Sequence, residues 1–544
     1  MNDNHIRESK IRERRRHIYR ILCELLLLII KAAAFYCIWM NFYNPNFRNP
    51  YVFKGNIFAA CVYVVLNLLM DRFYGGLKLG YHKPFNIIFG MSLTSVLTNI
   101  AAYFIIIIQA ATWFLTPVPA VVYMSLIDIA VVIIWGLVFS RLFRAVFPPN
   151  RLILVTQRSA DEIIGKFAER GDRYHIEKTL VLPEDYGTGM DMNAETAEGS
   201  RAGGAGKTAE NAAAADMLKA LYDGMSDFDG VIVGDMTAEL RNDILKNCYA
   251  NGVRTYTMPK ITDVILKSSE TLEAFDSPMF LNRNSGITPE QAAVKRLSDI
   301  IMSLMGLIIA SPFMLVIATA IKLEDHGPVF YKQKRCTKDG NVFEILKFRS
   351  MIVNAEQSGI SVPATERDPR ITKVGRVIRA TRFDELPQII NILKGEMSVV
   401  GPRPERIEHV REYSAEIPEF KYRMAVKGGL TGYAQVYGKY NTTPYDKLKL
   451  DLLYIQNYSI FLDLEIILKT VQVMFTKEST EGFDKRKSEE ITKLSMENVR
   501  DTESKDTESG TGNGAQSAGI KADKDNPLIT EHVSDNINTG SKEG

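Results

Sequence analysis

Two adjacent carboxylates, Asp384 and Glu385, have the residue types and spacing most suited to chemistry in this chain. Pro387 fits the first turn of a helix, and the run Gln388–Leu393 predicts that a helix continues from there. A helix N-terminus favours the anionic form of a carboxylate, so Asp384 could serve at neutral pH as a charged nucleophile or a metal ligand. The alternative is an ordinary capped helix with surface ion pairs, since acidic first turns are common.

The residues around this pair favour the chemical interpretation. Arg379 and Arg382 lie just upstream, and Arg403 follows in the short loop between Pro402 and Pro404. Cations and carboxylates this close together, at the start of an apolar helix, predict a phosphate-handling site with Mg²⁺. The two prolines are expected to restrict the loop that presents the arginine.

Composition bounds the kind of protein that positions this site. The chain has 544 residues, enough for several domains, and its net charge of +2 does not indicate nucleic acid as a partner. Five cysteines are scattered without the spacing of a metal or disulfide framework, which fits a reducing cytosolic face. The hydrophobic fraction of 46% averages a very apolar first quarter and a very polar tail.

The first quarter predicts four transmembrane helices within residues 17–145, preceded by a basic N-terminal segment, 1–16. Each apolar segment is near the roughly 20 residues that span a bilayer core. Basic residues at the start, middle and end of the region predict that both of its ends lie in the cytosol. A buried soluble helical core is the less consistent alternative for such lengths. The four segments are Ile21–Met40, Val52–Met70, Phe85–Ile108 and Pro117–Leu142.

A small Rossmann-like α/β domain is predicted over residues 151–267, because short buried strands alternate with helices there. The first strand runs into Gln157–Ala160 without a glycine loop, so we expect a structural or regulatory domain and no dinucleotide site. The expected strands are Arg151–Thr156, Asp229–Asp235 and Arg254–Tyr256, and the expected helices are Ala160–Glu169 and Glu239–Ala250.

Two segments are predicted to be disordered. Residues 187–215 are rich in Gly, Ala and Thr, and Gly203–Thr208 within them resembles a phosphate-binding loop. The spacing of that motif fails, because its first glycine would fall on Arg201 and no strand precedes it. The tail, residues 477–544, is rich in Ser, Thr, Glu, Lys, Asp and Gly and carries few apolar side chains.

A further apolar stretch, Leu297–Ile321, is interrupted by Ser311 and Pro312. Proline kinks a helix, and the serine hydroxyl can satisfy backbone groups that the kink frees. A straight fifth span would carry everything downstream out of the cytosol. Basic residues at both ends instead predict a helix over 296–323 that enters the membrane, bends at Ser311 and Pro312, and returns to the same face.

Several motifs that occur in order together resemble the bacterial sugar transferase family, the monotopic phosphoglycosyl transferases. The resemblance covers residues 290–476 and implies a mainly helical, membrane-associated catalytic domain there. With the four spans and the α/β domain, the chain resembles the long polyprenyl glycosylphosphotransferases of exopolysaccharide or O-antigen synthesis. The motifs are Lys295–Asp299, Lys347–Met351, Asp384–Gln388, Leu393–Ser398, Val400–Pro404, Gly429–Gln435 and Asp451–Ser459.

The resemblance implies transfer of a phosphosugar from a UDP-sugar to undecaprenyl phosphate, with release of UMP. It implies that Asp384 is the nucleophile that forms a covalent intermediate. It also implies that Glu385 and Asp384 bind the Mg²⁺ ion. It also implies a bacterial inner membrane location, contact with membrane lipid and a catalytic domain on the cytoplasmic face, and it leaves a homodimer open. The candidate phosphate-binding residues are Arg379, Arg403, Lys347 and Arg349.

The chain departs from the family's usual pattern at a few positions, which leaves the donor sugar open. Arg382 and Phe383 stand where the family usually has Ser-Leu, and Gly428 and Gly429 stand where Pro-Gly is frequent. Tyrosines replace two frequent tryptophans, at Tyr433 and Tyr458.

Two other functions remain open at this stage. One is a non-catalytic membrane scaffold or nucleotide-sensing regulator that works through the α/β domain. The other is a glycosyltransferase that passes sugar alone to a lipid carrier and therefore releases nucleoside diphosphate.

Overall fold

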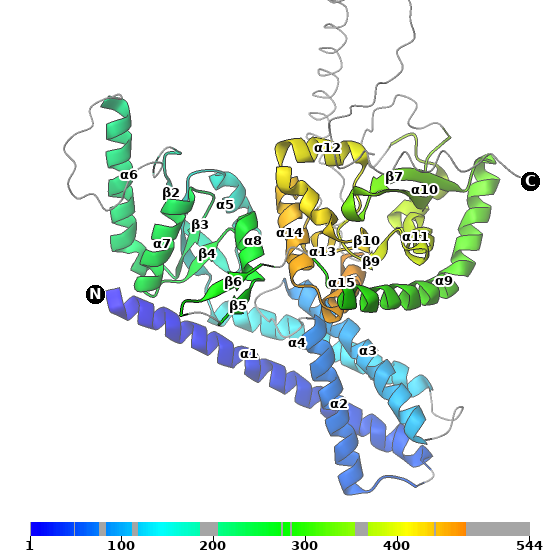
Figure 1. Cartoon of the computed structure of the whole chain (residues 1–544). Helices are drawn as coiled ribbons and strands as arrows, with labels where there is room; N and C mark the ends of the chain where they lie inside the picture. Colours follow the sequence, from blue (N-terminus) through cyan, green and yellow to red (C-terminus); the bar gives the residue numbers. More distant parts are fainter. Residues whose placement is uncertain are drawn as a thin grey trace, which may run out of the picture. The chain divides into compact units, whose positions relative to one another are not determined.

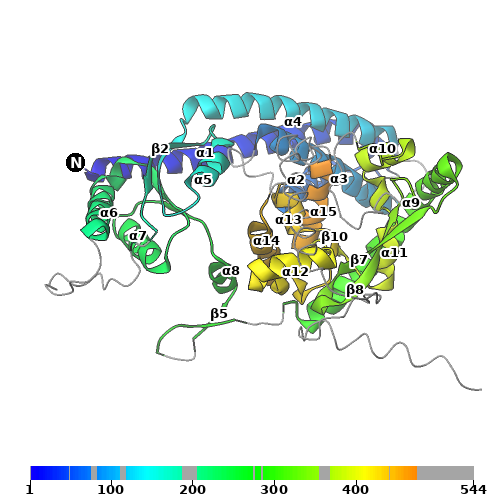
Figure 2. The same ribbon diagram turned by 90° about the horizontal axis from the view of Figure 1, so that it is seen from above.

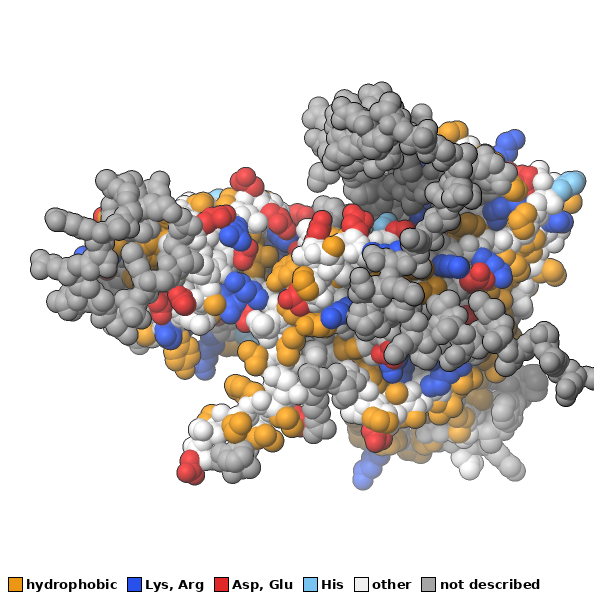
Figure 3. Space-filling model, turned by 45° about the horizontal axis from the view of Figure 1, so that its top comes forward, with side chains coloured by type: hydrophobic (Ala, Val, Ile, Leu, Met, Phe, Trp, Pro, Cys, Tyr) orange, Lys and Arg blue, Asp and Glu red, His pale blue; other side chains and the backbone are white. Residues whose placement is uncertain are grey.

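The computed structural model describes residues 2–47, 49–74, 83–110, 118–184, 186, 205–273, 276–282, 286–353, 368–439 and 442–474 (Figure 1). The chain forms two compact units, Met1–Pro259 and Lys260–Gly544. The predicted disordered tail, residues 477–544, lies outside the described residues. Acidic and basic side chains are interspersed over the face seen in Figure 3, as expected for a chain with a net charge of +2.

Four long helices open the first unit, and each contains one of the predicted apolar segments almost entirely. Neighbouring helices pack on one another, and α1 also packs on α4. Buried aromatic side chains fill one of the cores between them, where Phe35 stacks on Tyr63 with ring centroids 4.2 Å apart. All four are long and apolar enough to cross a membrane. They are α1 (Asn2–Ile38), α2 (Phe53–Tyr74), α3 (Pro84–Ala110) and α4 (Val118–Val146).

The basic N-terminal segment is the first part of α1 and packs on the α/β domain. Arg12 Nη1 pairs with Asp229 Oδ2 at 3.2 Å, and Arg16 Nη2 donates to the carbonyl oxygen of Pro148 at 2.6 Å. Arg254 Nη1 pairs with Glu13 Oε1 at 2.9 Å. These residues therefore join α1 to the domain that follows the four long helices.

The α/β domain has a parallel four-stranded sheet of order β2-β1-β3-β4. Side chains alternate along β1, so Leu152 and Leu154 face α5 while Ile153 and Val155 face α6 and α7. Figure 2 shows α5 on one side of the sheet and α6 and α7 on the other. The elements are β1 (Asn150–Thr156), α5 (Ala160–Ala168), β2 (Tyr174–Val181), α6 (Ala205–Gly224), β3 (Gly230–Val233), α7 (Ala238–Ala250) and β4 (Thr255–Thr257).

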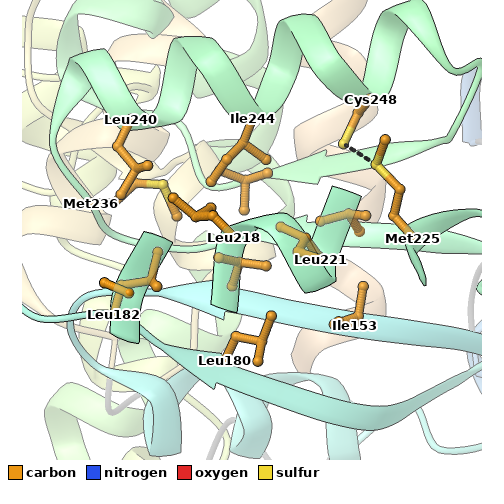
Figure 4. Close-up of a cluster of buried hydrophobic side chains, with 14 of the residues drawn as sticks. Ile153, Leu180, Leu182, Leu218, Leu221, Met225, Met236, Leu240, Ile244 and Cys248 are labelled. Carbon is orange, nitrogen blue, oxygen red and sulfur yellow. Dashed lines mark hydrogen bonds between the residues drawn. The ribbon is translucent and has the colours of Figure 1, made fainter. Parts of the chain in front are cut away.

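The larger core of this domain lies under α6 and α7 (Figure 4). Leu218 and Leu221 of α6 and Ile244 of α7 point toward the sheet, and Cys248 Sγ lies 4.0 Å from Met225 Sδ. The predicted strands and helices are present here, whereas the sequence analysis missed β2 and α6.

The prediction of a disordered insertion over 187–215 is wrong for its last part. Residues 187–204 lie outside the described residues, but the chain is helical from Ala205 onward, as the start of α6. Alanine has the highest helix propensity, and the buried side chains of Leu218 and Leu221 anchor the helix on the sheet.

The strand order reverses between β1 and β3, where doubly wound domains bind their ligands. Here the loops after these strands bond to each other, because the amides of Gln157 and Arg158 donate to the carbonyl oxygen of Asp235 at 3.0 and 3.2 Å. The Gln157 side chain accepts from the amide of Thr237 at 2.8 Å and donates to the carbonyl oxygen of Pro183 at 2.8 Å. Gln157 therefore links the loops that meet at this switch point.

The second unit starts with α8 (Ile261–Lys267), which the sequence analysis placed in the α/β domain. Its buried Ile261 and Val264 pack with Phe420 and Leu448. Ile261 and Val264 therefore belong to the hydrophobic core of the second unit.

The rest of this unit is mainly helical, with short strand pairs. Strands β7 and β8 form an antiparallel hairpin, and β9 pairs in parallel with β10. The elements are β5 (Glu270–Leu272), β6 (Met279–Leu281), α9 (Pro289–Asp325), β7 (Phe330–Cys336), β8 (Val342–Phe348), α10 (Lys373–Ala380), α11 (Gln388–Lys394), β9 (Ser398–Val400), α12 (Ile407–Glu416), β10 (Gly429–Thr431), α13 (Tyr433–Tyr437), α14 (Pro444–Gln456) and α15 (Ile460–Met474).

Helix α9 is long and apolar enough to cross a membrane, and Figure 1 shows that it bends along its length. Thr288 begins it with a capping box, in which its hydroxyl accepts from the amide of Gln291. Pro312 lies inside the helix, and Ser311 Oγ donates to the carbonyl oxygen of Ile308 at 2.9 Å. The proline and the back-bonding serine are the expected causes of the bend.

Polar side chains on the first turns of α9 hold it to the rest of the second unit. Arg296 donates to the carbonyl oxygens of Ile392 and Leu393 at 2.6 and 2.8 Å. These carbonyl groups lie at the end of α11, where the helix itself supplies no hydrogen-bond donor. Asp299 accepts from the Ser398 hydroxyl at 3.0 Å. Lys295 Nζ pairs with Asp463 Oδ2 of α15 at 2.7 Å, and both side chains are buried.

We expect Asp463→Ala to destabilise the protein by about 3–5 kcal/mol, because it leaves Lys295 buried without its counter-charge. Glu344→Ala removes one partner of an exposed pair with Lys332 and should cost at most about 1 kcal/mol. Free energies of unfolding of the two variants, measured in the same detergent, test this. Equal losses would contradict it.

Candidate active site

The two carboxylates lie on a short 3₁₀ turn, Phe383–Glu385, between α10 and α11. Arg382 precedes the turn in the left-handed region, with φ of +57°. The helix proper starts at Gln388, with Pro387 as its N-cap. The sequence analysis placed the start of the helix at the acidic pair, so the observed helix starts about one turn later than expected.

Glu385 is held between two cations. Its Oε1 accepts from Lys347 Nζ at 2.9 Å and from Arg403 Nη2 at 2.8 Å. Lys347 comes from β8, and Arg403 comes from the loop after β9. Three separate segments of the chain therefore meet at one carboxylate oxygen.

Burial alone would raise the pKa of Glu385, but the charges of Arg403 and Lys347 outweigh it and hold the pKa well below the ordinary value of 4.5. The Glu385 charge in turn raises the pKa of Arg403. Burial lowers the pKa of Lys347, and Glu385 partly offsets that effect. Glu385 is therefore an anion at neutral pH.

Asp384 lies beside this cluster and has a different environment. Among the described residues, no other side chain donates a hydrogen bond to its carboxylate. Burial raises its pKa above the ordinary 3.8, against the charge of Lys347, and Glu385 raises it further. Burial has the largest effect on the pKa of Asp384, and the N-terminus of α11 lies later in the chain, at Gln388.

The predicted cations divide into three groups. Lys347 and Arg403 meet at Glu385. Arg379 lies near enough for its charge to act on Asp384, and its guanidinium forms no hydrogen bond within the described residues. Arg349 is 7% exposed and forms an ion pair with Asp325 at the end of α9. It does not bind to Glu385.

The loop that carries Arg403 is supported by a residue that the sequence analysis missed, Arg423. Its Nη2 lies 2.8 Å from Asp451 Oδ2 and donates to the carbonyl oxygen of Arg403 at 3.0 Å. Burial raises the pKa of Asp451 to about 6, against the charge of Arg423. The motif Asp451–Ser459 pointed to Asp451 in the sequence. No local sequence pattern pointed to Arg423.

Close backbone contacts also shape this loop. A side chain at Gly429 would place its Cβ 2.1 Å from the Gly401 amide nitrogen, and one at Gly432 would place it 2.1 Å from the Gly401 carbonyl oxygen. Gly428 lies against Pro404, where an added Cβ would be 3.0 Å from the ring. The Gly428-Gly429 pair therefore fits a site where two backbones touch.

The donor set can be tested against Mg²⁺, which prefers oxygen ligands and is often held by one or two carboxylates together with substrate phosphates. In the described parts of the chain, no three His, Cys, Asp or Glu side chains are grouped to hold a metal ion. Asp384 and the second oxygen of Glu385 are carboxylate ligands of the right kind. The residues thus fit an ion shared with a substrate.

Comparison with known proteins places this site in a family. The family model for bacterial sugar transferases matches residues 290–477. A Klebsiella pneumoniae protein named UDP-glucose:undecaprenyl-phosphate glucose-1-phosphate transferase is 38% identical over 51% of this chain and 59% of its own length. An Aeromonas hydrophila protein named UDP-N-acetylgalactosamine-undecaprenyl-phosphate N-acetylgalactosaminephosphotransferase is 44% identical over 35% of this chain and 45% of its own length.

A third relative is matched over nearly its whole length. The exopolysaccharide production protein PSS of Rhizobium leguminosarum bv. phaseoli is 39% identical over 34% of this chain and 96% of its own length. The fold and the site define a membrane-associated protein with an acidic pair set among cations. This chain belongs to the bacterial sugar transferase family.

The low pKa of Glu385 has a pH consequence. A carboxylate with a lowered folded-state pKa contributes stability that is present above its unfolded value of 4.5 and is lost as pH falls through the folded value. We expect Glu385→Gln to cost about 2 kcal/mol, because two charge-assisted hydrogen bonds lose their anion.

This cost should stay constant from about pH 8 to about pH 5 and shrink only in stronger acid. Unfolding of both proteins along a pH series measures it. A difference that already disappears near neutral pH would contradict the assigned charge state.

Proposed function

We propose that this protein transfers a phosphosugar from a UDP-sugar to undecaprenyl phosphate, giving undecaprenyl-diphosphate-sugar and UMP. The observation that carries the proposal is the unequal environment of the acidic pair. Glu385 is neutralised by Lys347 and Arg403, whereas the described part of the chain gives Asp384 no side-chain hydrogen-bond donor. The names of the K. pneumoniae and A. hydrophila relatives support this reaction class.

In the first half-reaction, an Asp384 carboxylate oxygen attacks the phosphorus that carries the sugar. The new bond joins that oxygen to phosphorus, the bond between this phosphorus and the bridging oxygen breaks, and UMP leaves with both electrons. A carboxylate whose pKa is raised by burial is a stronger nucleophile than an ordinary one.

In the second half-reaction, a phosphate oxygen of the lipid attacks the same phosphorus. The bond to Asp384 breaks, and the carboxylate is regenerated without any net proton transfer. A covalent intermediate lets a soluble donor and a lipid acceptor use one site in turn.

The cations near the pair have distinct roles in this proposal. Arg403 is 35% exposed at its side chain and has further N–H groups with which to bind phosphate oxygens, and Arg379 has none of its N–H groups engaged by the described residues. Lys347 keeps Glu385 in place and adds positive charge near Asp384. Arg349 is paired with Asp325, and we assign it to holding the end of α9.

Asp384 and Glu385 would together hold Mg²⁺ when it is bound, and the ion would neutralise charge on the diphosphate. Their placement beside three cations supports a site that accepts such an anion.

We also propose that the protein resides in the bacterial inner membrane, with four transmembrane helices and a re-entrant α9, and that its catalytic domain lies on the cytoplasmic face. The bend of α9 and the basic residues at both of its ends support re-entry. Large apolar side chains are exposed along α9, as a lipid-facing helix requires; they include Leu297, Ile308, Ile309, Leu315 and Val316.

Of the alternative functions, a nucleotide-sensing regulator is disfavoured by Gln157, which occupies the switch point of the α/β domain. A transferase of sugar alone would have no use for a carboxylate nucleophile and would release UDP.

Asp384→Asn should abolish UMP release from UDP-sugars in the presence of undecaprenyl phosphate and Mg²⁺, because an amide cannot form the intermediate. A labelled phosphosugar should be trapped on the wild-type protein and not on this variant. Asp339→Asn, at an exposed turn, is the matched control and should keep full activity. Normal turnover by Asp384→Asn, or release of UDP, would refute the mechanism.

Membrane topology is testable with single cysteines in a cysteine-free chain. Asp339→Cys should react with an impermeant maleimide only when the cytoplasmic face is accessible. Asn46→Cys, between α1 and α2, should react only from the opposite face. Labelling of both from the same side would rule out the proposed arrangement.

A further inference from the structure

The four N-terminal helices bury polar side chains between them, within segments that are long and apolar enough to cross a membrane. Ionisable groups in such segments are costly and mark functional sites by default. The buried polar residues of these helices include Lys31, Asn67, Asp71, Thr94, Asn99 and Asp128.

The one cation of this group is already matched by an anion. Lys31 Nζ lies 4.0 Å from Asp71 Oδ2 and donates to Asn67 Oδ1 at 3.3 Å. Asp71 also accepts from the hydroxyl of Thr94 at 2.6 Å. Lys31 and Asp71 therefore form a neutral pair across α1 and α2.

Asp128 of α4 has no such partner. Its side chain is fully buried, and in the described part of the chain it forms no ion pair. Its Oδ2 lies 2.8 Å from Tyr63 Oη and 2.9 Å from Asn99 Nδ2, and its Oδ1 is buried without a hydrogen bond. Tyr63 Oη also lies 2.8 Å from Asn99 Oδ1.

These three side chains form a closed triangle of contacts, and its protons can be counted. Asn99 Nδ2 supplies a proton for the contact with Asp128. Tyr63 has one hydroxyl proton but lies at hydrogen-bond distance from two oxygens, Asn99 Oδ1 and Asp128 Oδ2. One proton is therefore missing if Asp128 is ionised.

Reversing the Asn99 amide does not remove the deficit. The amide nitrogen would then donate to Tyr63 and the phenol to Asp128, but the Asn99 oxygen would face Asp128 Oδ2 at 2.9 Å with no proton between them. With either orientation, an ionised Asp128 places two sets of lone pairs against each other. A carboxylic acid at this position supplies the missing proton.

We propose that Asp128 is a proton-binding site within the N-terminal helices, occupied at neutral pH, where the bound proton completes the hydrogen bonds among α2, α3 and α4. The charged and titratable groups that face it are Lys31 from α1 and Tyr63 and Asp71 from α2, while α3 contributes the neutral Asn99. Loss of the proton would leave a buried negative charge whose nearest cation is already paired. The site holds whether or not the protein is a transferase.

Infrared difference spectroscopy of the full chain in lipid vesicles at neutral pH tests this. The wild-type minus Asp128→Asn spectrum should contain the C=O stretch of a protonated carboxylic acid, shifted to lower frequency in D₂O. Carboxylate bands in its place would overturn the proposal. Tyr63→Phe gives a second readout, since loss of one hydrogen bond should shift that C=O band and leave its intensity unchanged.

Thermal unfolding supplies an independent test. Asp128→Asn replaces a neutral acid by a neutral amide of nearly the same shape, so the unfolding midpoint should not change. Asp71→Asn is the matched comparison and should lower the midpoint, because it leaves Lys31 buried without its anion. An equal drop in both variants would show that Asp128 is ionised.

Discussion

The candidate active site depends on the pairing of one carboxylate oxygen of Glu385 with two cations, Lys347 and Arg403. Burial alone would favour the protonated form of Glu385, but two positive charges keep this carboxylate ionised. The same contacts tie β8, the turn before α11 and the loop after β9 into one rigid site. The neighbouring Asp384 lies near the same charges, and in the described part of the chain no side chain donates a hydrogen bond to it.

Support for this arrangement comes from residues that touch no substrate in the proposed reaction. Arg423 joins the buried Asp451 to the backbone of Arg403, and Arg296 satisfies the carbonyl groups at the end of α11. Several of the family motifs therefore contain residues that position the site. These residues connect the bent helix α9 and the C-terminal helices to the loops that carry the site.

Local patterns predicted much of the structure. The apolar segments mark the long helices, and the buried run in β1 marks the first strand of the sheet. The acidic pair and its cations were also identified from the sequence, but not their pairing, because Lys347 is 38 residues from Glu385. Arg423 was missed for the same reason, since its partner Asp451 is 28 residues away. The start of α6 was misjudged because an alanine-rich composition suits both a loop and a helix.

The continuity of α1 has a mechanical consequence. A helix of 37 residues is about 55 Å long and resists bending, so its two ends move together. Its basic end binds the sheet domain through Arg12, Glu13 and Arg16. Its apolar part packs among the other long helices. A change in the tilt of α1 would therefore move the sheet domain together with the helix.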